Sequence, residues 1–289
     1  MMVKKMNKVK FPDIQCDDVF STCLLSVGNT KKEYMKKLER AADSIKAKWN
    51  EFDSQLESKQ LHLISPCKTK KPNQLIVSDV TKKELMDLYS DHMLKEKSEA
   101  RKIYNLLRAS ANGLCPFCGI SGVKTLDHYL PKSRYPALSV NPKNLVPACE
   151  NCNTGKKSSV FQSESDQTLY PYNDDSKFYS TQWISAKIIK NGFLTFEFFA
   201  NPPKAWSTIE RDRVLNHFEG YDLSSKYSLN SAQFVTSIMS NIRLMLQNGN
   251  YLYVQDHYNS LIDVVPVNST LKTMYKAIAS DVEVCKGHF

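Results

Sequence analysis

The stretch that decides the fold is CPFCGISGVKTLDHYLPKSRYPALSVNPKNLVPACENCNTGKK, which runs from Cys115 to Lys157. It contains two C-x-x-C pairs, the first at Cys115 and Cys118 and the second at Cys149 and Cys152. Four thiolates match the tetrahedral coordination of Zn²⁺, and four protein ligands leave no open position for water. The pattern predicts a structural zinc site, with a redox pair or plain buried thiols as the alternative.

The 30 residues between the two pairs carry polar side chains that are typical of a reactive site. They include Asp127, His128 and Asn144, and Asn153 directly follows the second pair. An insert of this length exceeds the linker of simple zinc ribbons. We therefore expect the insert to carry chemistry while the cysteines hold its ends.

An Asp-His dipeptide is not specific by itself, because it also occurs at residues 91–92 and 256–257. Neither of those copies has neighbouring cysteines or a following Asn-rich turn, so a surface or packed histidine is the simpler interpretation for both. The position of His128 between two metal knuckles distinguishes it from the other histidines.

Taken in order, Asp-His, an Asn sixteen residues later and C-x-x-C-N-x-x-K resemble the HNH, or ββα-metal, nucleases. The variant is the one with Asn in place of the last His, and the resemblance covers residues 115–158. It implies a strand that ends at His128, a second strand near Leu145 and a short helix that carries Asn153. The zinc would hold the loops between these elements.

The resemblance also implies metal-dependent hydrolysis of phosphodiester bonds in nucleic acid, with DNA favoured. Imidazole titrates near neutral pH and suits His128 as the general base. Asp127 and Asn153 offer hard oxygen ligands for a catalytic Mg²⁺ or Mn²⁺. Asn144 would brace the loop that carries His128. The candidate phosphate contacts, whose alternative is solvated surface charge, are Lys132, Arg134, Lys156 and Lys157.

The flanks, from Leu126 to Pro136 and from Leu169 to Tyr172, resemble the HNH subunit of Septu-type anti-phage systems. That type implies a nuclease held inactive by an SMC- or ABC-like ATPase partner, and it also occurs beside retron reverse transcriptase–RNA complexes. Two other interpretations stay open: a zinc-ribbon module that binds nucleic acid or a partner without cutting, and an RNA nuclease acting on a structured RNA such as tRNA.

The rest of the chain predicts an α+β fold with a mainly helical N-terminal part, the nuclease core, and a C-terminal β-hairpin with helices. The first 29 residues show no clear period and are expected to be an extended arm or short strands. Capping boxes at Thr30 and Thr81 open helices, the first about 30 residues long. A third helix over 99–111 ends at Gly113. The expected domains are 1–29, 30–112, 113–162 and 163–289.

Asn191-Gly192 between two strand-like runs, 183–190 and 193–200, predicts a hairpin. Helical patterns follow at about 207–219, 230–247 and 268–281. The segments on either side of the nuclease core, residues 30–110 and 205–289, contain more residues than the reaction needs. A role of these segments in assembling a complex is therefore compatible with the nuclease interpretation.

Composition excludes several classes of protein. Apolar content of 42% is ordinary for a globular chain, and no stretch is apolar enough to span a membrane. The basic start is followed by Phe11-Pro12-Asp13 instead of an apolar segment, so a cytoplasmic location is expected. The net charge is +9, and residues 1–110 hold 22 Lys and Arg against 15 Asp and Glu. This excess could attract phosphates or simply solvate a helical surface.

Overall fold

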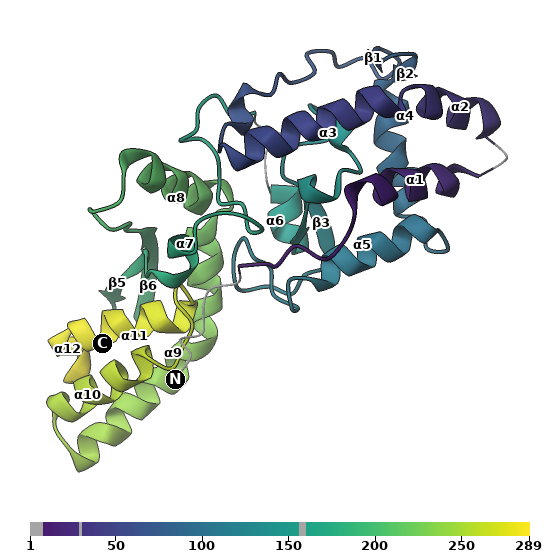
Figure 1. Ribbon diagram of the computed structural model, residues 1–289. Helices are drawn as coiled ribbons and strands as arrows, with labels where there is room; N and C mark the ends of the chain where they lie inside the picture. Colours follow the sequence, from purple (N-terminus) through teal and green to yellow (C-terminus); the bar gives the residue numbers. More distant parts are fainter. Residues whose placement is uncertain (1–7, 29–30, 156–159) are drawn as a thin grey trace. The chain divides into compact units, whose positions relative to one another are not determined.

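The computed structural model describes residues 8–28, 31–155 and 160–289, which form an α+β fold as predicted (Figure 1). Contacts divide the chain into two compact units. The N-terminal unit comprises residues 9–115 and 122–173. The C-terminal unit comprises residues 116–121 and 174–289, together with Lys8.

The N-terminal unit places helices around a small sheet in which β3 and β4 pair antiparallel. A second short antiparallel pair, β1 and β2, lies apart from it in the sequence. A π-helix, Leu88–Met93, continues α4. The elements are α1 (Cys16–Val27), α2 (Lys32–Arg40), α3 (Ala42–Glu57), β1 (Leu75–Val77), β2 (Val80–Thr81), α4 (Lys82–Asp87), α5 (Glu99–Ala109), β3 (Thr125–His128), β4 (Leu145–Ala148) and α6 (Glu150–Gly155).

The expectation of an extended arm over residues 1–29 is wrong where the structure describes it, because α1 occupies Cys16–Val27. Val19, Phe20, Cys23 and Val27 are buried, and their spacing is that of one helical face. The Ser and Thr residues between them are weak helix formers, so burial of this face against α5 decides the conformation.

The single 30-residue helix expected from Thr30 is also wrong. It is two helices, α2 and α3, which meet at Ala41, where ψ is −4°. α2 packs against α1, whereas α3 packs against the 3₁₀ turn Pro136–Leu138. The bend lets each helix bury its apolar face against a different neighbour. Thr30 itself lies outside the described residues.

The capping box at Thr81 is confirmed. The Glu84 N–H donates to the Thr81 hydroxyl (3.2 Å), and the Thr81 N–H donates to the Glu84 carboxylate (2.8 Å). The third predicted helix, α5, ends at Ala109, two residues before the expected end. Asn112 and Gly113 then adopt positive φ of 50° and 91°, the left-handed turn that Gly113 predicted.

The C-terminal unit combines the predicted hairpin with helices (Figure 1). β5 and β6 pair in register across Asn191-Gly192, and Gly192 has φ of 73°. α9 begins seven residues before the expected helix, and α10 was not predicted because exposed apolar residues blur its period. The elements are α7 (Lys177–Ser180), β5 (Ile184–Lys190), β6 (Leu194–Ala200), α8 (Thr208–Gly220), α9 (Leu223–Asn248), α10 (Tyr251–Ile262), α11 (Thr270–Ser280) and α12 (Val282–Cys285).

The core of the C-terminal unit includes Phe117, which lies between the two cysteines of the first pair. The Phe117 ring stacks on Tyr221 with centroids 4.5 Å apart, and the Phe117 carbonyl accepts a hydrogen bond from His217 Nε2 (2.8 Å). None of the helices in the described part of the chain combines the length and apolar character that a membrane span requires.

A buried ion pair in this unit gives a stability prediction. Arg213 contacts both oxygens of Asp174 (3.1 and 2.7 Å), and both side chains are about 95% buried, with 5% and 6% exposed. Arg213→Ala leaves a buried carboxylate without this partner, so we expect the free energy of unfolding to fall by about 3 kcal/mol. Urea denaturation measures this, with the exposed Lys204→Ala as control; equal stability of the two variants would refute it.

Candidate functional site

The four predicted zinc cysteines lie together. The Sγ atoms of Cys115, Cys118, Cys149 and Cys152 are all within 4.8 Å of one another, and all four residues are buried. Each is free of disulfide bonding. Ligand sulfurs on one tetrahedral ion are about 3.8 Å apart for bonds of about 2.3 Å, so this donor set fits a single metal ion.

Local backbone structure forms the first cysteine loop. Leu114 and Gly122 form an antiparallel bridge that closes the loop holding Cys115 and Cys118. Gly119 has φ of 67°, a left-handed conformation that a side chain would strain. The second pair follows β4, with Cys149 directly after the strand and Cys152 in α6. The two cysteine pairs thus lie at the ends of the segment that contains both strands.

His128 is the last residue of β3, and its ring nitrogens are distinguished by their surroundings. The Nε2 atom lies 2.8 Å from the Ser139 carbonyl, which can only accept a hydrogen bond. Nε2 therefore carries the proton in the neutral ring, and Nδ1 carries the lone pair. The imidazole also meets the Tyr89 ring edge-on, with centroids 4.4 Å apart. This geometry makes Nδ1 the basic nitrogen.

Asp127 and Asn153 share a face of the small sheet. The Thr125 hydroxyl donates to the Leu126 carbonyl (3.4 Å) and accepts from Asn153 Nδ2 (3.2 Å), which orients the amide. Thr125 and Asp127 are two residues apart in β3 and so point to the same face. α6 packs against that strand (Figure 1). The arrangement puts a carboxylate and an amide oxygen on one side of the sheet.

Asn144 is fully buried and ties down the loop after His128. Its Oδ1 accepts from the Leu130 N–H (2.7 Å), and its Nδ2 donates to the Leu130 carbonyl (3.0 Å) and the Leu138 carbonyl (3.3 Å). These bonds join the two ends of the loop through the Asn144 side chain.

The predicted basic contacts fall in different places. Lys132 Nζ donates to the Ser90 hydroxyl (2.8 Å) and lies 4.7 Å from the centre of the Tyr89 ring, which also contacts the His128 ring. Burial lowers the pKa of Lys132, against the raising effect of Asp87 and Asp91. The Tyr89 ring therefore contacts both Lys132 and the His128 imidazole.

Arg134 lines a separate cavity of about 140 Å³ beside Cys67, and its carbonyl accepts from the Cys67 N–H (2.7 Å). Lys156 and Lys157 lie outside the described residues.

The other Asp-His dipeptides lie in helical elements. His92 is buried in the π-helix, with Nδ1 3.3 Å from the Ser26 carbonyl, and His257 lies in α10 of the other unit. Neither has a neighbouring cysteine cluster.

Sequence reasoning missed three residues that touch this site. Thr125 was detectable, since it lies two residues before Asp127 on the same strand face. Ser139 contacts the imidazole through its backbone, which no sequence pattern reveals. Tyr89 lies in the π-helix that follows α4; burial raises its pKa, with further contributions from Tyr104 and Asp127.

Residues 115–159 match the family model described as HNH endonuclease. The chain therefore contains an HNH endonuclease domain, of the class that hydrolyses phosphodiester bonds, with a four-cysteine cluster that could hold a metal ion.

Two curated relatives extend this result. Protein ea31 of Escherichia phage lambda is 33% identical over 171 residues, which cover 58% of this chain and 58% of that protein. Septu protein PtuB of Bacillus thuringiensis is 42% identical over 52 residues, which cover 16% of this chain and 20% of that protein. The chain thus spans little more than half of one relative and a fifth of the other. No solved structure matches it.

The cysteine cluster predicts a metal-dependent fold. We expect Cys152→Ser to lose the bound metal and to lower the free energy of unfolding by at least about 3 kcal/mol, because metal binding adds to folding free energy. Metal content by emission spectrometry and urea denaturation measure the two effects. Cys67→Ser, outside the cluster, should retain both properties. Full metal content and stability in Cys152→Ser would show that the cluster is no metal site.

Proposed function

We propose that this protein is a divalent-metal-dependent endonuclease that cuts nucleic acid, with DNA as the favoured substrate. The observation that carries the proposal is the hydrogen bond between His128 Nε2 and the Ser139 carbonyl, inside the HNH domain. That bond holds the imidazole in the tautomer in which Nδ1 can accept a proton. A general base at the end of a strand, directly after a carboxylate in the sequence, suits phosphodiester hydrolysis.

In this mechanism His128 Nδ1 takes the proton from the attacking water. Asp127 and Asn153 would hold a catalytic Mg²⁺ or Mn²⁺, because carboxylate and amide oxygens are the ligands that these hard cations prefer. That ion supplies charge stabilisation for the phosphate and the leaving oxygen. Asn144 positions the base by fixing the loop that follows it.

The ion in the cysteine cluster is proposed to be Zn²⁺ with a structural role. Four buried thiols match the Cys₄ sites of structural zinc, and four protein ligands leave no position for a reacting water. The two metals are therefore assigned to different donor sets, sulfur for the fold and oxygen for the reaction.

Basic side chains near the HNH loop support a nucleic-acid substrate. The Cys67 N–H ties the segment that follows it to Arg134 on the loop between His128 and Asn144. The exposed lysines of that segment, for which the described residues supply no ion-pair partner, are Lys68, Lys70 and Lys71. Together with Lys132 they offer phosphate contacts on the unit that holds the site.

The similarity to Septu protein PtuB supports a role in anti-phage defence within a partner complex. We propose an SMC- or ABC-like ATPase as that partner, as the sequence flanks predict. The match covers a fifth of that protein, so the partner is a proposal. A retron reverse transcriptase–RNA complex stays a prediction from the sequence. The similarity to ea31 of phage lambda favours neither partner.

The first test compares wild type with His128→Ala on plasmid DNA, single-stranded DNA and total RNA, with Mg²⁺, Mn²⁺ or EDTA. Loss of the general base should slow cleavage about 10²- to 10⁴-fold while zinc content and fold persist. His257→Ala is the matched control, since it alters another Asp-His dipeptide in α10 and should cut like wild type. Equal cutting by His128→Ala and wild type would contradict the assignment of His128.

A second prediction concerns the catalytic metal. Asp127→Asn replaces a charged ligand by a neutral one, so the Mg²⁺ concentration for half-maximal cleavage should rise at least about tenfold. Cleavage rates over a Mg²⁺ titration measure this, with Asp256→Asn as control. An unchanged Mg²⁺ requirement would remove Asp127 from the proposed site.

A further inference from the structure

A buried tyrosine lies against the proposed general base. Tyr89 is 6% exposed and belongs to the π-helix Leu88–Met93. The centroids of its ring and the His128 ring are 4.4 Å apart, and the two planes meet at 72°. The Ser139 carbonyl holds Nε2 of the same imidazole (2.8 Å). The imidazole therefore has a hydrogen bond at one nitrogen and an aromatic ring against it, and both contacts restrict its rotation.

The Tyr89 hydroxyl has a partner that the small sheet leaves open. Leu126 pairs with Pro147 in the register of β3 and β4. Because proline has no N–H, Pro147 cannot donate to the Leu126 carbonyl. The Tyr89 hydroxyl donates to that carbonyl (3.3 Å), as does the Thr125 hydroxyl (3.4 Å). Burial raises the pKa of Tyr89, so the hydroxyl keeps the proton that it donates. Tyr89 is thus attached to the strand that ends at His128.

The same π-helix holds an ammonium group near the imidazole. Lys132 Nζ donates to the Ser90 hydroxyl (2.8 Å) and lies 4.7 Å from the centroid of the Tyr89 ring. The imidazole centre lies 4.4 Å from that centroid, so the ammonium and the imidazole are no farther apart than the sum of these two distances. Lys132 forms no ion pair with the residues that the structure describes. An ammonium has three N–H donors, so two are left for an anion.

Helices outside the HNH domain set the position of Tyr89. The Leu94 N–H donates to the Tyr89 carbonyl (3.0 Å), the i to i+5 bond of a π-helix, which occurs frequently at functional sites. The π-helix packs against α1, where His92 Nδ1 lies 3.3 Å from the Ser26 carbonyl. Tyr89 and Ser90 are consecutive, and both contact residues of the HNH segment. An element that precedes residues 115–159 therefore contributes to the site.

We propose that Tyr89 is a positioning residue of the nuclease reaction, an inference that rests on the proposed function. Its ring keeps the His128 imidazole and the Lys132 ammonium at a fixed separation, so that both act on one phosphodiester. The water oxygen bonds to phosphorus while its proton passes to His128 Nδ1. The leaving oxygen takes the electron pair of the broken bond and then a proton from solvent. Lys132 donates to the phosphate oxygens, where negative charge develops.

The alternative is that Tyr89 is an ordinary core residue. It also packs on Tyr104 of α5, with ring centroids 6.4 Å apart. A core role predicts that replacement of Tyr89 lowers stability and leaves the turnover of each folded molecule unchanged. A positioning role predicts a fall in kcat at nearly constant KM, because a misplacement of about 1 Å can cost about 10²-fold in rate.

The test compares full-length wild type, Tyr89→Phe and Tyr89→Leu on the nucleic acid that wild type cuts. Tyr89→Leu removes the ring, so kcat per folded molecule should fall about 10- to 10²-fold with KM within about threefold. Tyr89→Phe keeps the ring and should stay within about threefold of wild type. Tyr258→Leu is the matched control, because Tyr258 is a buried tyrosine of the other unit whose hydroxyl donates to the Ile238 carbonyl (3.5 Å). It should cut like wild type.

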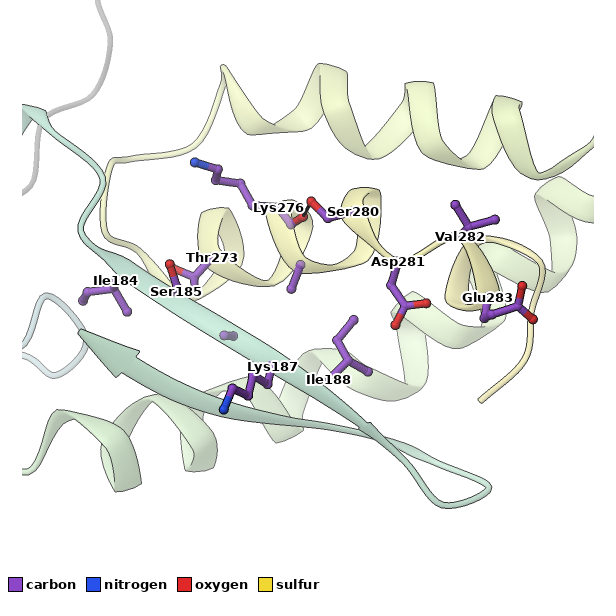
Figure 2. Close-up of a pocket in the computed structure, with 12 residues that line it drawn as sticks. Ile184, Ser185, Lys187, Ile188, Thr273, Lys276, Ser280, Asp281, Val282 and Glu283 are labelled. Atoms are coloured by element: carbon purple, nitrogen blue, oxygen red, sulfur yellow. Dashed lines mark hydrogen bonds between the residues drawn. The ribbon is translucent and has the colours of Figure 1, made fainter. Parts of the chain in front are cut away.

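A double-mutant cycle tests the link to Lys132. In the Lys132→Ala background, Tyr89→Leu should lower kcat at least about threefold less than in wild type, because the ring no longer has an ammonium to hold. Lys276→Ala is the control background. Lys276 is exposed on α11, and Figure 2 shows its side chain extending away from β5. There Tyr89→Leu should keep its full effect.

The outcomes distinguish this inference from the proposed function. Wild type that cuts no nucleic acid would overturn both. Wild type that cuts, with equal kcat per folded molecule in Tyr89→Leu, would overturn the positioning role alone. Additive effects of Tyr89→Leu and Lys132→Ala would overturn it as well, and so would a Tyr89→Phe variant as slow as Tyr89→Leu. Tyr89→Met, which lacks a ring but fills more of the space, replaces the leucine variant if that variant does not fold.

Discussion

The four-cysteine cluster is the constraint on which the candidate site depends. Two strands of four residues and a helix of six are too small to bury a core that would hold them together. The cysteines lie before β3, at the end of β4 and within α6, so one ion on all four would fix the ends of every element. The helix that carries Asn153 then has little freedom to leave the strand that carries Asp127.

The helices of the N-terminal unit stabilise the part of the site that the cysteines do not contact. The loop from Tyr129 to Asn144 has little regular structure, yet it supplies the carbonyl that orients His128. Trp49 of α3 donates its indole N–H to the Ala137 carbonyl (2.8 Å), and the Ser139 hydroxyl bonds the Leu85 carbonyl. The helical residues before the domain therefore support the geometry of the imidazole, although there are more of them than the reaction itself needs.

The parts that could be predicted are those whose chemistry is local in sequence. Cysteine spacing, the Asn-Gly turn and the capping box at Thr81 each act over a few residues, and the structure contains all three elements. The bend at Ala41 depends instead on two different packing partners. Ser139 reaches His128 through a backbone carbonyl that any residue could provide. The bend and the carbonyl contact both depend on the tertiary fold, so they cannot be recognised in a single sequence.

The donor set proposed for catalysis also has a consequence for control. One carboxylate and one neutral amide bind a hard divalent ion weakly in water, because such cations favour several oxygen ligands and keep their hydration. A phosphate oxygen would complete the set, so metal binding and substrate binding would strengthen each other by linkage. With Asp127 and Asn153 in these roles, little metal is held until a nucleic-acid backbone is in place. Any partner that governs access of that backbone would then govern the reaction without touching His128.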